Sequence, residues 1–149
     1  MADMTNENIA EIADLANQLE NLTDAMIVLN LRQCERKIFL EDAQLELTEH
    51  AHERQKLTEK INELKLLRET RPTNNDLTGS MIDFCVSLHE LTEGLIFLSI
   101  RQSDKKISSE NARQELDEHV AENKNLKEQI KKVLDEAEGL HQNNQKGND

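Results

Sequence analysis

Residues 25–38 read AMIVLNLRQCERKI, and residues 94–107 read GLIFLSIRQSDKKI. In both stretches an almost wholly apolar heptapeptide runs directly into a basic, polar one. The stretches lie 69 residues apart, and the similarity extends beyond them. Aligned at this offset without a gap, residues 12–64 and 81–133 are identical at 20 of 53 positions. We therefore interpret the chain as an internal duplication, with repeats at residues 9–69 and 78–138.

The apolar residues of each repeat follow alternating spacings of three and four. The series begins with Ile12, Leu15 and Leu19 in the first repeat, and with Met81 and Phe84 in the second. Sixteen consecutive positions of each repeat stay in phase. They span more than seven heptads, whereas three or four are enough to make a coiled coil credible. With four Gly and one Pro among 149 residues, the chain has few places to turn. The sequence predicts one all-α domain over residues 1–149.

The strongest helix breaker, Pro72, lies between the repeats and marks a linker over residues 70–77. Thr73 or Asp76 can cap the helix that follows it. The polar tail, residues 140–149, follows a candidate capping glycine, Gly139, and we expect the tail to be disordered.

We favour a long antiparallel coiled-coil hairpin in which each repeat is one continuous helix of about 60 residues. Pairing Leu64 with Met81 places the centre of such a hairpin beside Pro72. Two hairpins would then assemble into a four-helix bundle, which makes the protein a homodimer.

The alternative is a compact four-helix bundle within one chain, in which each repeat bends near residue 38 or 107. Lys and Arg are absent from residues 1–31 and 72–100, cluster in 32–37 and 101–106, and are followed by new acidic residues. Acids first and bases last is the order that a helix dipole favours, and residues 108–110 (SSE) look like an N-cap. We rank this fold second because the first repeat has no Gly, Pro, Asn or Ser between Leu31 and Leu47 to build a turn.

Six large apolar residues fall outside the seam of a two-stranded coiled coil. Such a patch is costly in water, so we predict that it is an interface. A second copy of the chain is the favoured occupant, and docking of a different protein is the alternative. The six residues are Ile27, Val28, Leu31, Ile96, Phe97 and Ile100.

Polar residues interrupt the predicted seam at equivalent places in the two repeats. Gln33 and Gln102 are interpreted as a device that fixes the register. For Arg36 and Lys105, at the next seam positions, the simpler interpretation is a side chain that reaches out to solvent along the seam. These four residues occupy core positions of the heptad pattern.

His50 and His119 also fall on the seam, each within a Glu-Leu-x-Glu-His-x-x-Glu pattern. A di-iron bundle would require Glu three residues before His, where this chain has Leu47 and Leu116. We interpret both histidines as polar core residues and expect no metal or cofactor.

The formal net charge of −12 argues against direct binding to nucleic acid or to an anionic membrane, and it is compatible with a basic protein partner. No apolar run approaches the length that spans a bilayer. Cys34 and Cys85 fit neither a metal-ligand spacing nor a disulfide framework. We therefore expect a cytoplasmic location.

The function that we favour is protein–protein interaction without catalysis, as a self-associating adaptor or as an inhibitor of a partner. One alternative is an acidic mimic of nucleic acid that blocks a basic cleft. The least favoured alternative is an all-α, metal-dependent nucleotide pyrophosphatase. Glu90-x-x-Glu93 and Glu115-x-x-Glu118 match its Glu-x-x-Glu signature only superficially, because the heptad phase turns Glu90, Glu93 and Glu118 outward.

Overall fold

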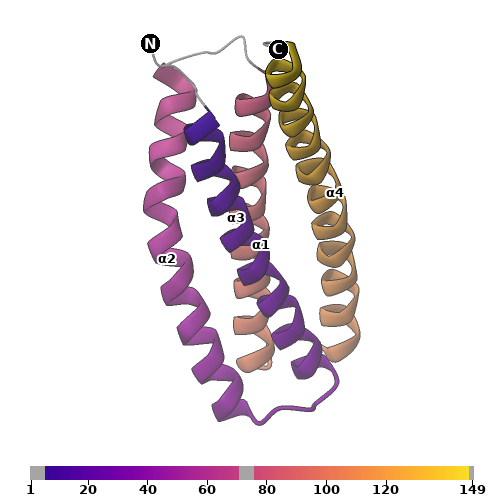
Figure 1. Cartoon of the computed structure of the whole chain (residues 1–149). Helices are drawn as coiled ribbons and strands as arrows, with labels where there is room; N and C mark the ends of the chain where they lie inside the picture. The colour runs from indigo at the N-terminus through magenta and orange to yellow at the C-terminus, as the bar shows by residue number, and fades with distance from the viewer. Residues whose placement is uncertain (1–5, 71–75, 148–149) are drawn as a thin grey trace.

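The computed structural model describes residues 6–70 and 76–147, which form a bundle of four α-helices (Figure 1). They are α1 (Asn6–Cys34), α2 (Leu40–Thr70), α3 (Asp76–Ser103) and α4 (Ser109–Gly147). The prediction of an all-α chain is confirmed. The arrangement is the compact bundle within one chain, and the long hairpin is wrong because each repeat forms two helices joined by a turn.

The turns form without glycine or proline. After α1, Arg36 adopts the left-handed conformation with a φ of 58°. The N–H of Lys37 donates to the carbonyl of Arg32 at 2.8 Å, and the N–H of Arg36 donates to the carbonyl of Gln33 at 3.2 Å. This pair of bonds is the Schellman motif that ends many helices, usually with glycine at the left-handed position. The second repeat ends α3 in the same way, with Lys105 at a φ of 57°.

The second helix of each repeat begins differently. The hydroxyl of Ser108 accepts a hydrogen bond from the N–H of Asn111 at 3.1 Å, which confirms the predicted N-cap of α4. Phe39 takes the equivalent position before α2, where two acidic residues follow in the first turn. Helix α4 continues through Gly139 to Gly147, so the helix end expected at Gly139 is wrong. A glycine inside an exposed helix costs only about 1 kcal/mol. Residues 71–75 of the predicted linker and 148–149 of the predicted tail lie outside the described residues.

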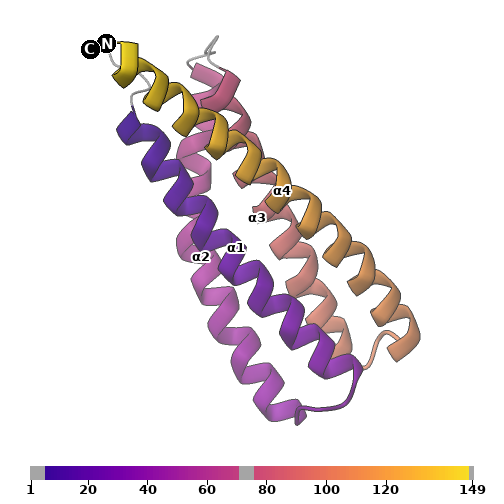
Figure 2. The ribbon, with the colours of Figure 1, turned by 45° about the vertical axis from the view of Figure 1, so that its right-hand side comes forward.

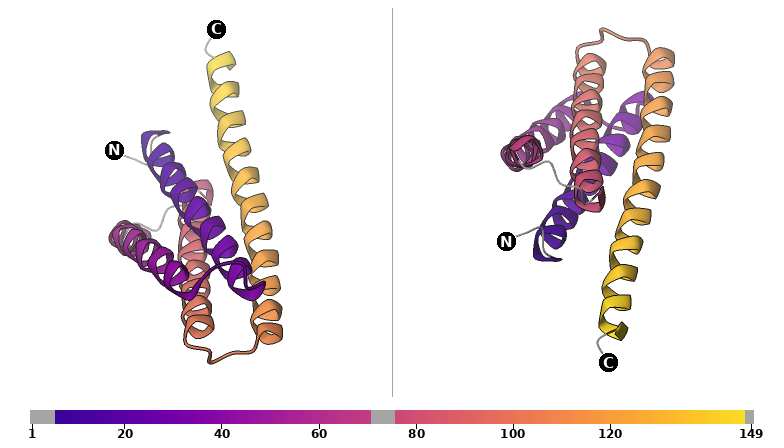
Figure 3. Two further views of the ribbon diagram at one scale, coloured as in Figure 1. Left: turned by 90° about the horizontal axis from the view of Figure 1, so that it is seen from below. Right: turned by 90° about the horizontal axis from the view of Figure 1, so that it is seen from above.

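Helices α1 and α3 run parallel, side by side, through the middle of the bundle. Helices α2 and α4 run in the opposite direction on its two flanks, as Figures 2 and 3 show. Within the described residues, α2 packs on α1 and α3, α4 packs on the same two helices, and α2 and α4 do not touch. The two repeats are therefore related by a pseudo-twofold axis that runs between α1 and α3. Both turns lie at one end of the bundle, which we call the turn end.

The core contains most of the positions that the spacing of three and four identified. Leu19, Met26 and Leu29 of α1 are fully buried, as are their equivalents in α3. A second stripe of buried side chains, smaller and more polar, runs beside the first. It exists because α1 and α3 are each packed against all three other helices, so one apolar face is not enough. Its fully buried polar members are Thr23, Asn30, Thr78, Thr92 and Ser99.

Candidate functional site

The pseudo-twofold axis is lined by polar side chains. Thr23 and Thr92 are equivalent residues of the two repeats, and their buried hydroxyls lie 2.8 Å apart across the contact between α1 and α3. An isolated hydroxyl in an apolar core would be costly, so the pairing of two hydroxyls satisfies both.

Ten residues further along each helix, two glutamines cross the same contact. The amide of Gln102 donates to the side-chain oxygen of Asn30 at 2.9 Å. The hydroxyl of Ser99, the equivalent of Asn30, donates to the side-chain oxygen of Gln33 at 2.7 Å. Both glutamines therefore lie between α1 and α3, and their role in fixing the register stays a prediction.

The other polar residues assigned to the seam lie elsewhere. Arg36 and Lys105 are exposed in the turns, because each repeat bends at the place where a continuous helix would have kept them on the seam. His50 and His119 are half-buried. A Cβ added to Gly94 of α3 would lie 3.3 Å from the His119 ring, so this histidine packs within its own hairpin.

Two polar clusters join the hairpins to each other. In the first, Asp24 of α1 accepts a hydrogen bond from Asn123 at 3.0 Å and pairs with Lys127 at 2.7 Å, both on α4. The carboxyl group of Glu20 lies near the same pair of charges, and its partial burial raises its pKa.

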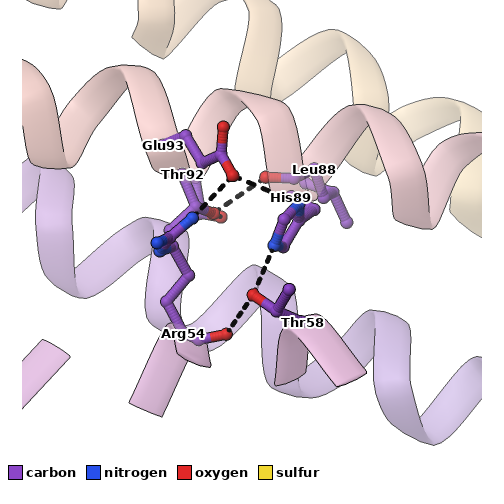
Figure 4. A network of polar contacts seen from close by, with 7 residues as sticks. Arg54, Thr58, Leu88, His89, Thr92 and Glu93 are labelled. Atoms are coloured by element: carbon purple, nitrogen blue, oxygen red, sulfur yellow. Dashed lines mark hydrogen bonds and ion pairs between the residues drawn. The ribbon is translucent and has the colours of Figure 1, made fainter. Parts of the chain in front are cut away.

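The second cluster occupies the equivalent positions between α3 and α2 (Figure 4). Arg54 pairs with Glu93 at 2.6 Å, and the hydroxyl of Thr58 lies 2.8 Å from Nε2 of His89. His89 is 5% exposed. Its burial lowers the pKa of the imidazole, and the nearby carboxylate of Glu93 opposes this effect. The repeats have thus kept the positions of these clusters while changing their chemistry.

Within each hairpin an arginine and a glutamate hold the turn end together. Arg101 donates two hydrogen bonds to the carboxylate of Glu115, at 2.9 and 2.8 Å, and this interaction lowers the pKa of that carboxyl group. Arg32 and Glu46 form the equivalent pair in the first repeat. The first glutamate of the repeated Glu/His pattern is therefore bound to arginine. Among the described residues, no three His, Cys, Asp or Glu side chains are grouped so that they could hold a metal ion.

The six residues predicted as an interface are divided by the structure. Ile96 is buried, and Ile27 and Leu31 pack against the core. The chain's own four-helix packing thus covers part of the face that we assigned to a partner. Phe97 is 59% exposed, Val28 51% and Ile100 39%.

Phe97 lies on an outer face of α3 that also carries acidic residues. Asp83 and Glu90 precede Phe97 on α3 at intervals of seven, and Asp104 follows it at the same interval in the turn after the helix; all four side chains are exposed. The guanidinium of Arg101 lies over the phenyl ring, 4.7 Å from its centroid. Because Arg101 is itself fixed by two hydrogen bonds to Glu115, the ring is held in place.

The groups that the less favoured functions would use are largely engaged or dispersed. Glu93 and Glu115 pair with arginines, and Glu90 and Glu118 are exposed on different helices. Burial raises the pKa of the Cys85 thiol to about 12, which suppresses its thiolate form. None of the described helices combines the length and the hydrophobicity needed to cross a membrane.

No protein family, curated protein or solved structure matches the chain. The axial threonines and the two clusters were missed from the sequence. The offset of 69 pairs Thr23 with Thr92 and Asp24 with Glu93, which is the signal that could have found them. Both pairs lie off the heptad seam, where the sequence suggested solvent.

Proposed function

We propose that the chain acts by binding a basic protein segment on the outer face of α3, without catalysing a reaction. The observation that carries this proposal is the exposed ring of Phe97. The chain has three Phe and no Tyr or Trp. Two of the three are exposed, Phe39 before α2 and Phe97 on α3, and Phe97 is the one whose ring lies against an arginine. Covering such a side chain is worth about 1.5–3 kcal/mol. A partner that buries Phe97 and Ile100 would gain this free energy.

The charge around the ring favours a basic partner over a second copy. Glu90 of α3 and Asp104 of the turn after it are exposed, and they would steer and pair with Lys or Arg of another protein. Asp83, seven residues before Glu90, already pairs with Arg68 of α2. A symmetric contact between two copies through this face would bring identical carboxylates together. Self-association stays a prediction, and the experiment below separates it from binding to a basic partner.

The rigidity of the site supports a binding role. Arg101 holds the ring of Phe97 from one side and is fixed to Glu115 on α4. A side chain that is already ordered loses less conformational entropy when a partner binds. A bundle with such a face suits an adaptor, or an inhibitor that covers the basic surface of its partner.

The test uses a short, fluorescent, amphipathic helical peptide of Leu and Lys as the probe, and it measures binding by fluorescence anisotropy. The double variant Phe97→Ser/Ile100→Ser should bind about tenfold more weakly or worse, as expected when a central contact is removed. The matched control is Val28→Ser, at the position equivalent to Phe97 on the opposite face, and it should bind like the wild type. Equal affinities for the wild type and the double variant would refute the proposal.

Two further measurements distinguish the alternatives. The affinity that remains after a rise from about 50 to 300 mM salt measures docking through the apolar centre. Loss of all binding, with no remaining difference between the wild type and the double variant, indicates the nucleic-acid mimic instead. Size exclusion with light scattering gives the mass of the wild type. A wild-type dimer that the double variant dissociates would assign the face to a second copy and overturn the basic partner.

A further inference from the structure

The turn end of the bundle contains a depression with a volume of about 780 Å³. It lies where the pseudo-twofold axis leaves the protein, so its lining consists largely of equivalent residues from the two repeats. Gln33 and Gln102 line it where the polar ladder of the axis ends. Its volume is within the range of about 300–1,000 Å³ that is usual for small-molecule sites.

Arg36 and Lys105 both line this depression. They are the non-glycine residues with a positive φ in the described part of the chain, at 58° and 57°. Glycine would adopt this conformation without steric cost. Both repeats nevertheless have a long basic side chain there. Backbone strain that is kept in duplicate points to a use for the side chains.

Neither cation has an ion-pair partner among the described residues. Of the arginines that the structure describes, Arg36 is the one without a carboxylate partner; Arg32, Arg54, Arg68, Arg101 and Arg113 are all paired. Lys105 likewise forms no ion pair or hydrogen bond with another described side chain. Balancing the C-terminal dipoles of α1 and α3 does not explain them, because Arg32 and Arg101 already place a cation in each last turn.

The remaining lining is suited to an amphiphile. Ile38 and its equivalent Ile107 are half-buried walls, and Leu40 adds apolar surface on the side of α2. On the opposite side lie Ser108, whose hydroxyl also caps α4, and Ser109, the first residue of α4. One lining carboxylate, Glu110, opposes the charge of the two cations.

We propose that this depression binds a small amphiphilic anion, with its oxyanion head between Arg36 and Lys105 and its apolar body against Ile38, Ile107 and Leu40. The site is separate from the face of Phe97, and it stands whether or not that face binds a protein. The head group is a carboxylate or a phosphate, because both are recognised by an arginine and a lysine.

The test titrates the ¹⁵N-labelled full chain with decanoate, with decyl phosphate, with decanol and with inorganic phosphate, and follows the amide resonances. Decanoate or decyl phosphate should shift resonances of residues 33–43 and 102–112, and the tighter ligand identifies the head group. Decanol lacks the charge and inorganic phosphate lacks the apolar body, so each should bind about tenfold more weakly or worse. Binding of either one as tightly as the amphiphiles would overturn the proposal.

The variant Arg36→Gln/Lys105→Gln should lose about tenfold or more of the affinity for the better amphiphile. The matched control, Lys37→Gln/Lys106→Gln, changes the net charge equally at neighbouring residues that do not line the depression, and it should bind like the wild type. The variant Arg36→Gly/Lys105→Gly relieves the backbone strain and should also lose binding, which separates ligand recognition from folding. Equal loss in the control pair, or unchanged affinity in the first variant, would contradict the site.

Discussion

The hydroxyl groups of Thr23 and Thr92, equivalent residues of the two repeats, meet at 2.8 Å on the pseudo-twofold axis. Each hydroxyl is also within hydrogen-bond distance of the carbonyl four residues earlier, on Leu19 at 2.6 Å and on Leu88 at 2.8 Å. Two hydroxyl protons therefore serve three contacts. The two hydroxyls are therefore coupled, because the one that donates across the axis cannot also donate to its own carbonyl.

This sharing predicts non-additive substitutions. Thr92→Val alone removes one donor and one acceptor from a buried pair, and it should lower the free energy of unfolding by about 1 kcal/mol. Thr23→Val/Thr92→Val removes both polar groups at nearly constant shape, and it should cost less than the sum of the two single variants. Urea denaturation of the wild type, both singles and the double gives the coupling. Additive costs would mean that the hydroxyls do not act together.

The strained turns predict stabilisation by glycine. A non-glycine residue in the left-handed conformation costs about 1–2 kcal/mol, and glycine loses part of that gain through its freedom in the unfolded chain. Arg36→Gly and Lys105→Gly should therefore each raise the free energy of unfolding by about 0.5–1 kcal/mol. The control Arg36→Ala removes the side chain and keeps the strain, so its stability should stay close to that of the wild type. A glycine variant less stable than the alanine variant would show that the backbone at this position is relaxed.

His89 predicts a loss of stability at mildly acidic pH. Its burial lowers the pKa in the folded state below the ordinary value of 6.5. The unfolded state then binds the proton more readily, so the contribution of this residue is complete above pH 6.5 and is lost as the pH falls through the lower, folded pKa. The measurement is the difference in unfolding free energy between the wild type and His89→Gln, taken from pH 8 down to about pH 5. The difference should shift against the wild type as the pH falls.

The difference between these two proteins is needed because Glu20 acts in the opposite direction. Its folded pKa is raised above 4.5, so its contribution is present at low pH and is lost as the pH rises through the folded value. Both proteins carry Glu20, and its effect largely cancels. A difference that is flat with pH would show that the imidazole of His89 is as easily protonated in the bundle as in water.

Gly94 predicts a tolerated substitution in the middle of α3. A Cβ at this position would lie 3.3 Å from the ring of His119, which requires only a small shift of a half-buried side chain. The equivalent residue of the first repeat is Ala25. Gly94→Ala should raise the free energy of unfolding by about 0.5–1 kcal/mol through higher helix propensity. Gly94→Val, with a branched Cβ, should reverse the gain. Thermal denaturation of the two variants tests both signs.

The sequence predicted the helical class, the repeat and most of the core, because these depend on residues that recur every three or four positions. It also predicted the cap at Ser108, whose hydroxyl is placed where a helix start needs an acceptor. The favoured hairpin had no turns within the repeats, because Arg36 and Lys105 are not residues that break helices; the alternative bundle, with bends near residues 38 and 107, contained them. The order of acids and bases within each repeat indicates the turns, and both turns form without glycine at the left-handed position.

The polar residues between α1 and α3 and those of the two clusters were not predicted for a different physical reason. Thr23 and Asn30 look like surface residues of a two-stranded coil, yet they are fully buried because α1 packs against three helices. A periodic pattern shows which face of a helix is apolar, and it does not show how many neighbours the helix has. The residues that depend on the neighbours, such as the pair Thr58 and His89, therefore became visible only in the bundle.

Each hairpin is closed by its own five-residue turn at one end of the bundle, and the two hairpins are connected in sequence only at the other end. The packing between α1 and α3 therefore does not depend on which hairpin comes first in the sequence. A circularly permuted chain that begins with α3 and α4 and continues into α1 and α2 would bring Thr92 and Thr23 to the same place. The connection fixes the order of the two hairpins in the sequence. The packing of the four helices is the same in either order.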